Sequence, residues 1–243
     1  MIRAIFVLTL LMALPVRAAE LMVLAPGTMG PGLKALAETW SAETGNSVKF
    51  TLGTVGGAKT NAIGDMPADL LVVPVGEFSG IAAKLKYGPP IPVGWARFWL
   101  AVKKGAPHPD ISTLAKFIAV LKASSGLIYA DPSGGSYSGA RAEAMLKRPD
   151  FTGVKGLART GAPAARVAAG EADYGAGVLS EEINVAGVEV AGPFPKELAM
   201  DIDYRGAVLA KTKEPDAAAA FLHYIARPES GAAWKAAGID PAN

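Results

Sequence analysis

The sequence contains no cysteine, two histidines and almost no excess of charge. Without cysteine there is no disulfide, no Cys-ligated zinc and no thiol nucleophile. His108 and His223 are far apart in the sequence, and neither has a further metal ligand nearby. No Ser-His-Asp arrangement is suggested either. We therefore predict no metal site, no cofactor and no catalytic residue set.

The charge balance excludes several partners. Lys and Arg total 24 and Asp and Glu total 22, for a net charge of +2. Two of the cations, Arg3 and Arg17, fall in an N-terminal segment that we expect to be removed, which leaves a nearly neutral chain. Neither a nucleic-acid surface nor a basic membrane patch is predicted. The hydrophobic fraction of 51% is ample for a folded core.

The first residues have the pattern of a secretory signal. Arg3 precedes an apolar run over residues 5–14 that is too short to span a bilayer, and small residues at Val16 and Ala18 suit a signal peptidase. We expect a signal peptide over residues 1–18, cleaved after Ala18. Since the chain lacks the cysteine that anchors bacterial lipoproteins, we expect a soluble periplasmic monomer with no stable membrane insertion.

The remaining chain alternates short apolar runs with helical patterns. Apolar runs at residues 21–24, 48–52 and 70–73 are separated by helical patterns, and this βαβαβ order indicates a parallel sheet. Gly-rich turns follow strands at residues 25–32, 53–57 and 131–139. A turn of this kind at a helix start presents free backbone N–H groups, which favours binding of an anion.

Two longer extended runs, at residues 95–102 and 202–209, are suited to pass between two halves of the molecule. We therefore predict a two-lobed α/β fold with mixed, mostly parallel sheets flanked by helices and two crossing strands at a hinge. Lobe I comprises residues 19–93 and 206–243, and lobe II comprises residues 94–205. The Gly-rich turns of both lobes then face each other across a cleft that hinge motion closes on a ligand.

Several motifs, in this order and spacing, resemble the periplasmic molybdate-binding proteins of ABC importers, which have the class II periplasmic binding protein fold. They lie at residues 24–29, 50–56, 66–70, 131–139, 170–173, 225–229 and 238–241. The resemblance covers nearly the whole chain after the signal. It implies capture of a molybdate-like oxyanion by hydroxyls and backbone N–H groups, and delivery to an ABC permease in the inner membrane.

The resemblance also implies which residues contact the ligand. Where that family has a serine hydroxyl in the first lobe and a tyrosine hydroxyl in the second, this chain has Val55 and Val178, so a small organic carboxylate is an open alternative. Arg97 or Arg141 could then bind the carboxylate. The predicted ligand-binding residues are Gly27, Thr28, Met29, Thr54, Val55, Gly56, Ser136, Tyr137, Ser138, Gly139, Arg141, Thr160 and Val178. Plain structural roles stay open for three of them: helix capping for Thr28, turn formation for Ser136 and Ser138.

Two further segments, residues 105–113 and 179–181, resemble a divergent branch of the same family that includes a periplasmic aconitate isomerase. This implies an alternative function, an isomerase of a small tricarboxylate that uses the same cleft. Such an enzyme needs a base in the cleft, and Tyr137, Asp131 or Glu181 would supply it. A binding protein without catalysis is the preferred interpretation.

Overall fold

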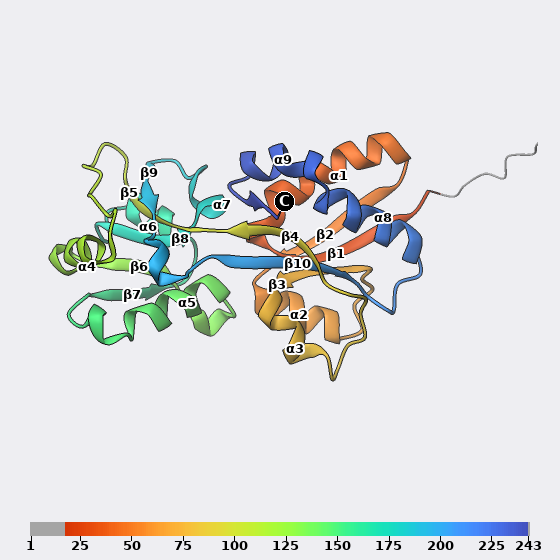
Figure 1. Cartoon of the computed structure of the whole chain (residues 1–243), viewed down its shortest axis with the longest axis horizontal. Helices are drawn as coiled ribbons and strands as arrows, with labels where there is room; N and C mark the ends of the chain where they lie inside the picture. The colour runs from red at the N-terminus through yellow and green to blue at the C-terminus, as the bar shows by residue number, and fades with distance from the viewer. Residues whose placement is uncertain (1–17, 243) are drawn as a thin grey trace, which may run out of the picture.

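The computed structural model describes residues 18–242. The expected signal peptide, apart from Ala18, lies outside these residues. Two β-sheets lie one after the other along the long axis of the molecule, each with its own helices (Figure 1). We call the part built on the six-stranded sheet the first lobe and the part built on the five-stranded sheet the second lobe.

The first lobe contains a six-stranded sheet in the order β11-β4-β10-β3-β1-β2. The β1–β2 and β1–β3 pairs are parallel, whereas β10 and β4 join in antiparallel fashion. Its strands are β1 (Glu20–Pro26), β2 (Ser47–Gly53), β3 (Leu70–Pro74), β4 (Ile91–Ala96), β10 (Ile202–Val208) and β11 (Asp240–Pro241). Its helices are η1 (Gly27–Met29), α1 (Gly30–Thr44), α2 (Val55–Ile63), α3 (Val75–Ile81), α8 (Pro215–Ala226), η5 (Pro228–Ser230) and α9 (Gly231–Ala236).

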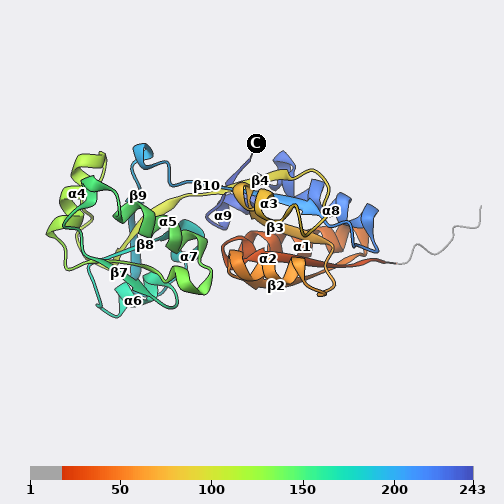
Figure 2. The same ribbon diagram turned by 90° about the horizontal axis from the view of Figure 1, so that it is seen from below.

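Helices cover both faces of this sheet, so side chains on opposite faces of β1 pack in two different hydrophobic cores. Leu21 and Val23 pack in one core with residues of α1, α8 and α9. Leu24 packs in the other with residues of α2 and α3. All five residues of β3 are buried, as expected for a strand covered on both faces. The two helix layers lie above and below the sheet in Figure 1, and Figure 2 shows the same lobe from the side of α2 and α3.

The second lobe contains a five-stranded sheet in the order β7-β6-β8-β5-β9, again with parallel and antiparallel pairs. Its strands are β5 (Phe98–Lys103), β6 (Leu127–Ala130), β7 (Gly156–Arg159), β8 (Tyr174–Val178) and β9 (Val188–Pro193). Its helices are α4 (Leu114–Ala123), η2 (Pro132–Gly134), α5 (Tyr137–Leu146), η3 (Pro149–Phe151), α6 (Pro163–Ala168), α7 (Leu179–Glu182) and η4 (Lys196–Leu198). Two mixed sheets flanked by helices confirm the predicted α/β fold class.

The chain passes between the sheets at Arg97 and again between β9 and β10. The run over residues 95–102, expected to pass between the lobes, does so as two strands, because it is divided at Arg97 into β4 and β5. β4 pairs with β10 and β11 in the first sheet, and β5 pairs with β8 and β9 in the second. The predicted lobe bounds near residues 93 and 205 fall inside β4 and β10. The chain leaves the first sheet at the end of β4, residue 96, and returns to it at the start of β10, residue 202.

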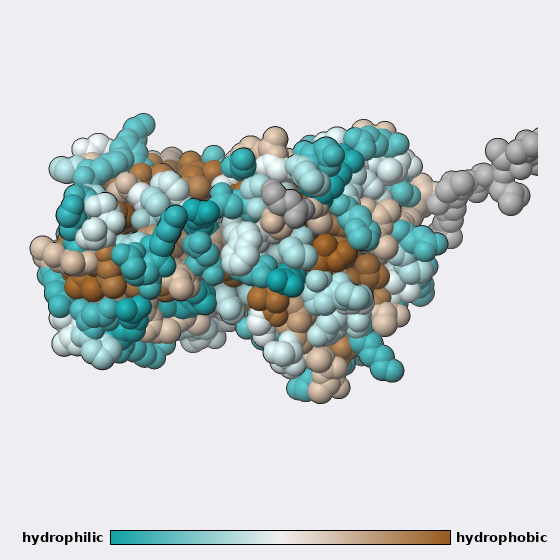
Figure 3. Space-filling view, in the orientation of Figure 1, coloured by the Kyte–Doolittle hydropathy of each residue, from teal (hydrophilic) through white to brown (hydrophobic). Residues whose placement is uncertain are grey.

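The surface in Figure 3 is hydrophilic over most of the visible face, with apolar residues in separate patches. Among residues 18–242, no helix combines the length and apolar character needed to cross a membrane.

Candidate functional site

A cavity of about 420 Å³ lies where the loops of the two lobes meet. Thr54 lines it from the first lobe, and the other lining residues come from the second. They are Ala130, Asp131, Ser133, Gly134, Ser136, Ser138, Thr160, Gly161, Ala162, Pro163 and Glu181. The structure thus brings together four residues of the predicted set, Thr54, Ser136, Ser138 and Thr160, although they belong to three different turns.

Two helices begin at this cavity, and each has a hydroxyl at its N-cap. Thr54 caps α2 by accepting a hydrogen bond from the Gly57 N–H at 3.1 Å. Ser136 caps α5 by accepting one from the Gly139 N–H at 3.0 Å. A hydroxyl that accepts at a cap keeps its own hydrogen for a ligand. The helix starts add partial positive charge, so the cavity suits an anion without a cationic side chain.

The backbone of the two lobes is in direct contact beside the cavity. The Gly56 N–H of α2 donates to the Gly135 carbonyl at 3.3 Å. A Cβ added to Gly56 would lie 3.2 Å from the Gly135 Cα, so a side chain here would push the lobes apart. Gly56, predicted as a ligand contact, therefore has a structural role in closure of the cleft.

A second contact between the lobes joins Thr28 to Glu181. The Thr28 hydroxyl donates to Glu181 Oε1 at 2.5 Å, between residues 153 positions apart in the sequence. Thr28 is buried in η1, and no side chain caps α1, so the open alternative of Thr28 as a helix cap is wrong. The Thr28 hydroxyl, a predicted ligand contact, thus binds a carboxyl group of the opposite lobe in this structure.

Burial shifts the pKa values of the carboxyl groups around this contact. Burial raises the pKa of Glu181 above its usual range, and the hydrogen bond from Thr28 partly opposes this rise. Burial and the neighbouring Glu181 raise the pKa of Glu182 still further. Glu182 is 2% exposed, and neither of its carboxyl oxygens has a hydrogen-bond partner in the described part of the chain. Burial without a hydrogen-bond partner thus favours the neutral, protonated form of Glu182 over the ionised one.

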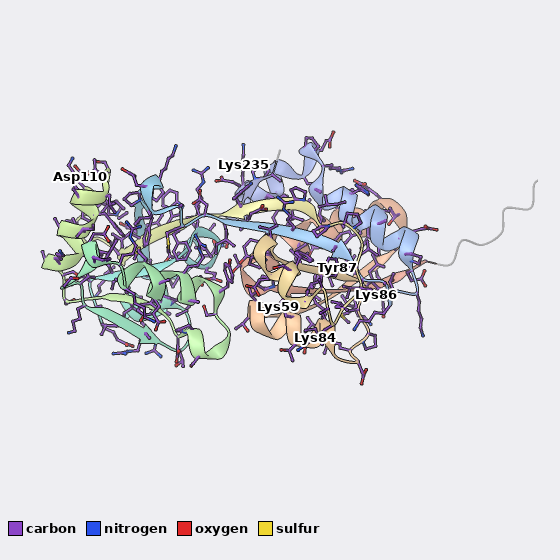
Figure 4. The ribbon with its side chains drawn as sticks, turned by 60° about the horizontal axis from the view of Figure 1, so that its bottom comes forward. Lys59, Lys84, Lys86, Tyr87, Asp110 and Lys235 are labelled. Carbon is purple, nitrogen blue, oxygen red and sulfur yellow. The ribbon has the colours of Figure 1, made fainter. Side chains whose placement is uncertain are left out.

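The described lining of the cavity contains two carboxyl groups, Asp131 and Glu181, and no Lys or Arg. Asp131 accepts a hydrogen bond from the Ser133 backbone N–H at the start of η2, which lowers the pKa of its carboxyl. Lys59, one turn beyond Thr54 on α2, is seen on the first lobe in Figure 4, and its ammonium group forms an ion pair with Glu77. The donors available to a ligand are thus hydroxyls and backbone N–H groups.

Several predicted residues do not present their side chains to the cavity. Met29, Val55 and Val178 are buried in the hydrophobic cores, so only their backbone groups remain candidates. The Arg141 guanidinium donates to the Ala199 carbonyl. Arg141 also lines a different cavity, together with Ala144, Met145, Arg148, Leu198 and Met200.

Three others lie next to the cavity. Gly27 precedes Thr28 in η1. Tyr137 is partly buried and packs against both hydrophobic core clusters. Gly139 allows α5 to start directly on β6, since a Cβ there would lie 1.9 Å from the Ala130 carbonyl oxygen.

Residue patterns gave little indication of Glu181 as a cavity residue. It was a candidate base for an enzyme but not part of the predicted ligand set. Residues 179–182 contain two consecutive glutamates, a pattern typical of an exposed helix start. The available signal was the position of Glu181 immediately after the buried strand β8, where parallel-sheet ligand sites lie.

Comparison with known proteins identifies the family. Residues 21–240 match the family described as "Bacterial extracellular solute-binding protein". An aconitate isomerase from Pseudomonas sp. is 31% identical over 152 residues, which is 62% of this chain and 58% of that protein. The chain thus matches less than two thirds of the length of this relative.

Solved structures agree with the fold. The substrate-binding domain of a putative molybdenum ABC transporter from Clostridium difficile superposes with a TM-score of 0.74 at 16% identity, covering 93% of this chain and 100% of that one. The periplasmic molybdate-binding protein of Azotobacter vinelandii gives a TM-score of 0.72 at 16% identity, covering 92% and 100%. Since the family match spans nearly all of the described residues, this chain belongs to the bacterial extracellular solute-binding protein family.

Proposed function

We propose that this protein captures a small anion in the cavity between its lobes and delivers it, in the periplasm, to an ABC permease. The observation that carries the proposal is the convergence of two hydroxyl-capped helix starts, α2 and α5, on a cavity with no Lys or Arg in its described lining. Uncharged donors at helix N-termini bind oxyanions and carboxylates well in a site that excludes water.

The proposal includes hinge motion of the two lobes as units. The lobes are joined by the crossings at Arg97 and before β10, and in the structure they touch through Gly56 and Gly135. Opening at the crossings would admit the ligand, and closure would bury it between α2 and α5. The similarity to proteins named for molybdate and molybdenum supports an oxyanion, whereas Val55 and Val178 leave room for an organic carboxylate.

A ligand panel tests this function. Thermal shifts should be measured with molybdate, tungstate, sulfate, phosphate, citrate and both aconitate isomers, followed by calorimetry on each hit. A ligand that binds only the folded protein raises the melting temperature in proportion to the logarithm of its concentration. No shift with any member of the panel would rule out capture of a small anion.

A matched pair of variants locates the site. Ser138→Ala removes a cavity hydroxyl that caps no helix, and Ser79→Ala removes an exposed hydroxyl on α3, far from the cavity lining. Leaving one ligand oxygen unpaired costs about 1–3 kcal/mol, which is roughly 5- to 150-fold in Kd. Calorimetry should show this loss for Ser138→Ala and none for Ser79→Ala. Equal affinities would place the ligand elsewhere.

A second candidate function is isomerisation of a small tricarboxylate. The specific observation is Glu181, a cavity carboxyl whose pKa is raised by burial and whose position is held by Thr28. A base with a raised pKa suits removal of a proton from one carbon and its return to another, and this chemistry needs no cofactor. The 31% identity to an aconitate isomerase supports this candidate.

Turnover distinguishes the two candidates. The protein should be incubated with cis-aconitate in deuterium oxide, and the trans isomer and its deuterium content followed by NMR. An isomerase would form the trans isomer with deuterium incorporated, and Glu181→Gln would abolish this. Binding of aconitate without turnover would exclude the enzyme and leave the binding protein.

A further inference from the structure

The described lining of the cleft combines hydroxyl and backbone donors with two acceptor groups, the carboxyls of Asp131 and Glu181. Glu181 Oε1 accepts from Thr28, and no described group donates to Oε2. An ionised carboxylate can only accept hydrogen bonds, and so can a fully deprotonated oxyanion. A ligand oxygen that meets Glu181 therefore needs a proton between them.

No Lys or Arg in the described lining of the cavity relieves this requirement. Glu181 interacts electrostatically with Glu182 on its own helix and with Tyr204 on β10, and Tyr204 in turn interacts with Tyr137 on α5. Tyr204 is almost fully buried, and burial raises the pKa of its phenol, so it stays neutral. Across the cavity lies Asp131, a second carboxylate.

Among the charged residues on the elements around α7, Arg97 lies at its start, because the Arg97 carbonyl accepts from the Leu179 N–H. The Arg97 guanidinium forms an ion pair with Asp240. The strands β5 and β9 carry Lys103 and Glu189, and Glu189 pairs with His108. The turn after α9 lies against Ser180 through Gly238, and Lys235 projects from α9 near the border between the lobes in Figure 4. Neither Lys103 nor Lys235 belongs to the described lining of the cavity.

We propose that Glu181 makes the cleft selective for anions that carry a hydrogen-bond donor, such as a singly protonated oxyanion or a hydroxy acid, over anions that carry none. A donor-bearing ligand supplies the proton shared with Glu181. A fully deprotonated ligand such as sulfate or molybdate binds only when Glu181 takes a proton from solvent. This inference rests on the proposed capture of an anion in the cavity and names the class of anion.

This selectivity is the difference between the affinities for donor-bearing and donor-free anions. It arises mainly because the donor-free anion binds poorly. A buried acceptor facing an acceptor leaves two groups unpaired, which is a larger penalty than the loss of one ordinary hydrogen bond. Thr28 strengthens the effect, because its hydrogen bond to Oε1 holds the carboxyl toward the cleft.

Two ligand pairs of matched shape test the inference by calorimetry. The first pair is inorganic phosphate and sulfate at about pH 8, where phosphate keeps one proton and sulfate has none. The second is citrate and tricarballylate, which differ by one hydroxyl. In each pair for which binding is detected, the wild type should bind the donor-bearing member at least roughly tenfold more tightly than the donor-free member.

Variants assign the effect to Glu181. In Glu181→Gln the amide supplies a donor, so the ratio within a pair should fall to about threefold or less, mainly through tighter binding of the donor-free member. The control is Glu197→Gln, an exposed carboxyl on η4 away from the cavity lining, which should keep the wild-type ratio. Circular dichroism and thermal melts confirm that each variant is folded.

The pH dependence gives an independent readout. Sulfate affinity in the wild type should fall as the pH rises, by up to about tenfold per unit, because Glu181 must be protonated for sulfate to bind. In Glu181→Gln this slope should disappear. Equal binding of both members of a pair, unchanged in Glu181→Gln, would overturn the inference and leave the proposed function standing. Binding of none of the four ligands, by either wild type or variant, would overturn the inference, whereas anion capture would fall only if the remaining members of the thermal-shift panel also failed to bind.

Discussion

At the scale of single residues, close backbone contacts and buried carboxyl groups shape the cleft. Gly139 lets α5 begin against the last residue of β6, and Glu182 is a buried residue of α7, the helix that also carries Glu181. A Cβ on Gly177 would lie 2.6 Å from Glu182 Oε1, so a glycine on β8 provides the space for this carboxyl. Substitution of Gly139 or of Glu182 should therefore change the free energy of unfolding by a measurable amount.

We predict that Gly139→Ala destabilises the protein. The added Cβ would lie 1.9 Å from the Ala130 carbonyl oxygen, a backbone atom that cannot move without shifting β6. The free energy of unfolding should fall by about 1–3 kcal/mol or more, as for other overpacked sites. Urea denaturation measures this. Gly134→Ala in the preceding turn has open space for its Cβ and is the control; equal losses in both variants would contradict the prediction.

We predict that Glu182→Gln stabilises the protein at neutral pH. Because the folded-state pKa of Glu182 is raised above the ordinary value of 4.5, the folded protein holds a proton that the unfolded chain releases. Its contribution to stability is therefore full below about pH 4.5 and is lost as the pH rises toward the raised value. Each unit of pKa difference is worth about 1.4 kcal/mol.

Urea denaturation at about pH 4 and pH 8 tests this sign. The variant and wild type should be nearly equal at the lower pH, and the variant should be more stable at the higher one. Glu38→Gln, an exposed carboxyl on α1, should not alter the pH dependence. An unchanged pH slope in Glu182→Gln would show that Glu182 is ionised in the folded protein.

At the scale of elements, the crossing between β4 and β5 is fixed by contacts to neighbouring segments. The Arg97 carbonyl accepts from the Leu179 N–H at 3.1 Å, which ties the crossing to the start of α7. Its guanidinium pairs with Asp240 of β11 and lies 3.9 Å from Asp201, next to the second crossing. One residue thus contacts three segments that meet where the lobes join.

We predict a small stability effect for Arg97→Gln. The Arg97 side chain is 47% exposed and its partners are similarly exposed, so the ion pairs are screened by solvent. Such pairs contribute about 0–1 kcal/mol, and less at high salt. Urea denaturation at low and high salt checks this, with Lys49→Gln, which breaks the exposed pair with Glu20, for comparison. A loss above about 2 kcal/mol would identify a structural role beyond an exposed ion pair.

At the scale of the whole molecule, the two lobes are in contact across the cleft. Gly56 meets Gly135 through the backbone, and Thr28 meets Glu181 through side chains. Both contacts join a segment of one lobe directly to a segment of the other, in addition to the two chain crossings. The balance between open and closed states should therefore depend on a few residues at the contact.

We predict that Gly56→Leu holds the lobes apart. A Cβ at Gly56 already lies 3.2 Å from the Gly135 Cα, and a leucine cannot fit without separation of the two backbones. Small-angle scattering should show a larger radius of gyration than in the wild type. Gly80→Leu on the exposed side of α3, where a Cβ meets nothing within 4 Å, is the control. Equal radii for all three proteins would mean that the wild type is already open in solution.

Much of the scaffold could be predicted from local sequence. The expected strands at residues 21–24, 48–52 and 70–73 lie within β1, β2 and β3, and the helix expected to end at Gly45 does so, with Gly45 in the left-handed conformation. Buried strands and glycine caps depend on residues close together in the chain, so their patterns are readable. Thr54 and Ser136 were likewise expected at turns before helices.

The sequence by itself determined the two-sheet α/β scaffold and the positions of the hydroxyl-bearing turns, because hydrophobic periodicity and turn chemistry act over a few residues. The tertiary structure alone decided the chemistry between those turns. It placed the Glu181 carboxyl on Thr28 from 153 positions away, divided the run 95–102 at Arg97 between two sheets, and buried Val55 and Val178. Contacts across such separations depend on how the sheets pack together, a property that no local pattern carries.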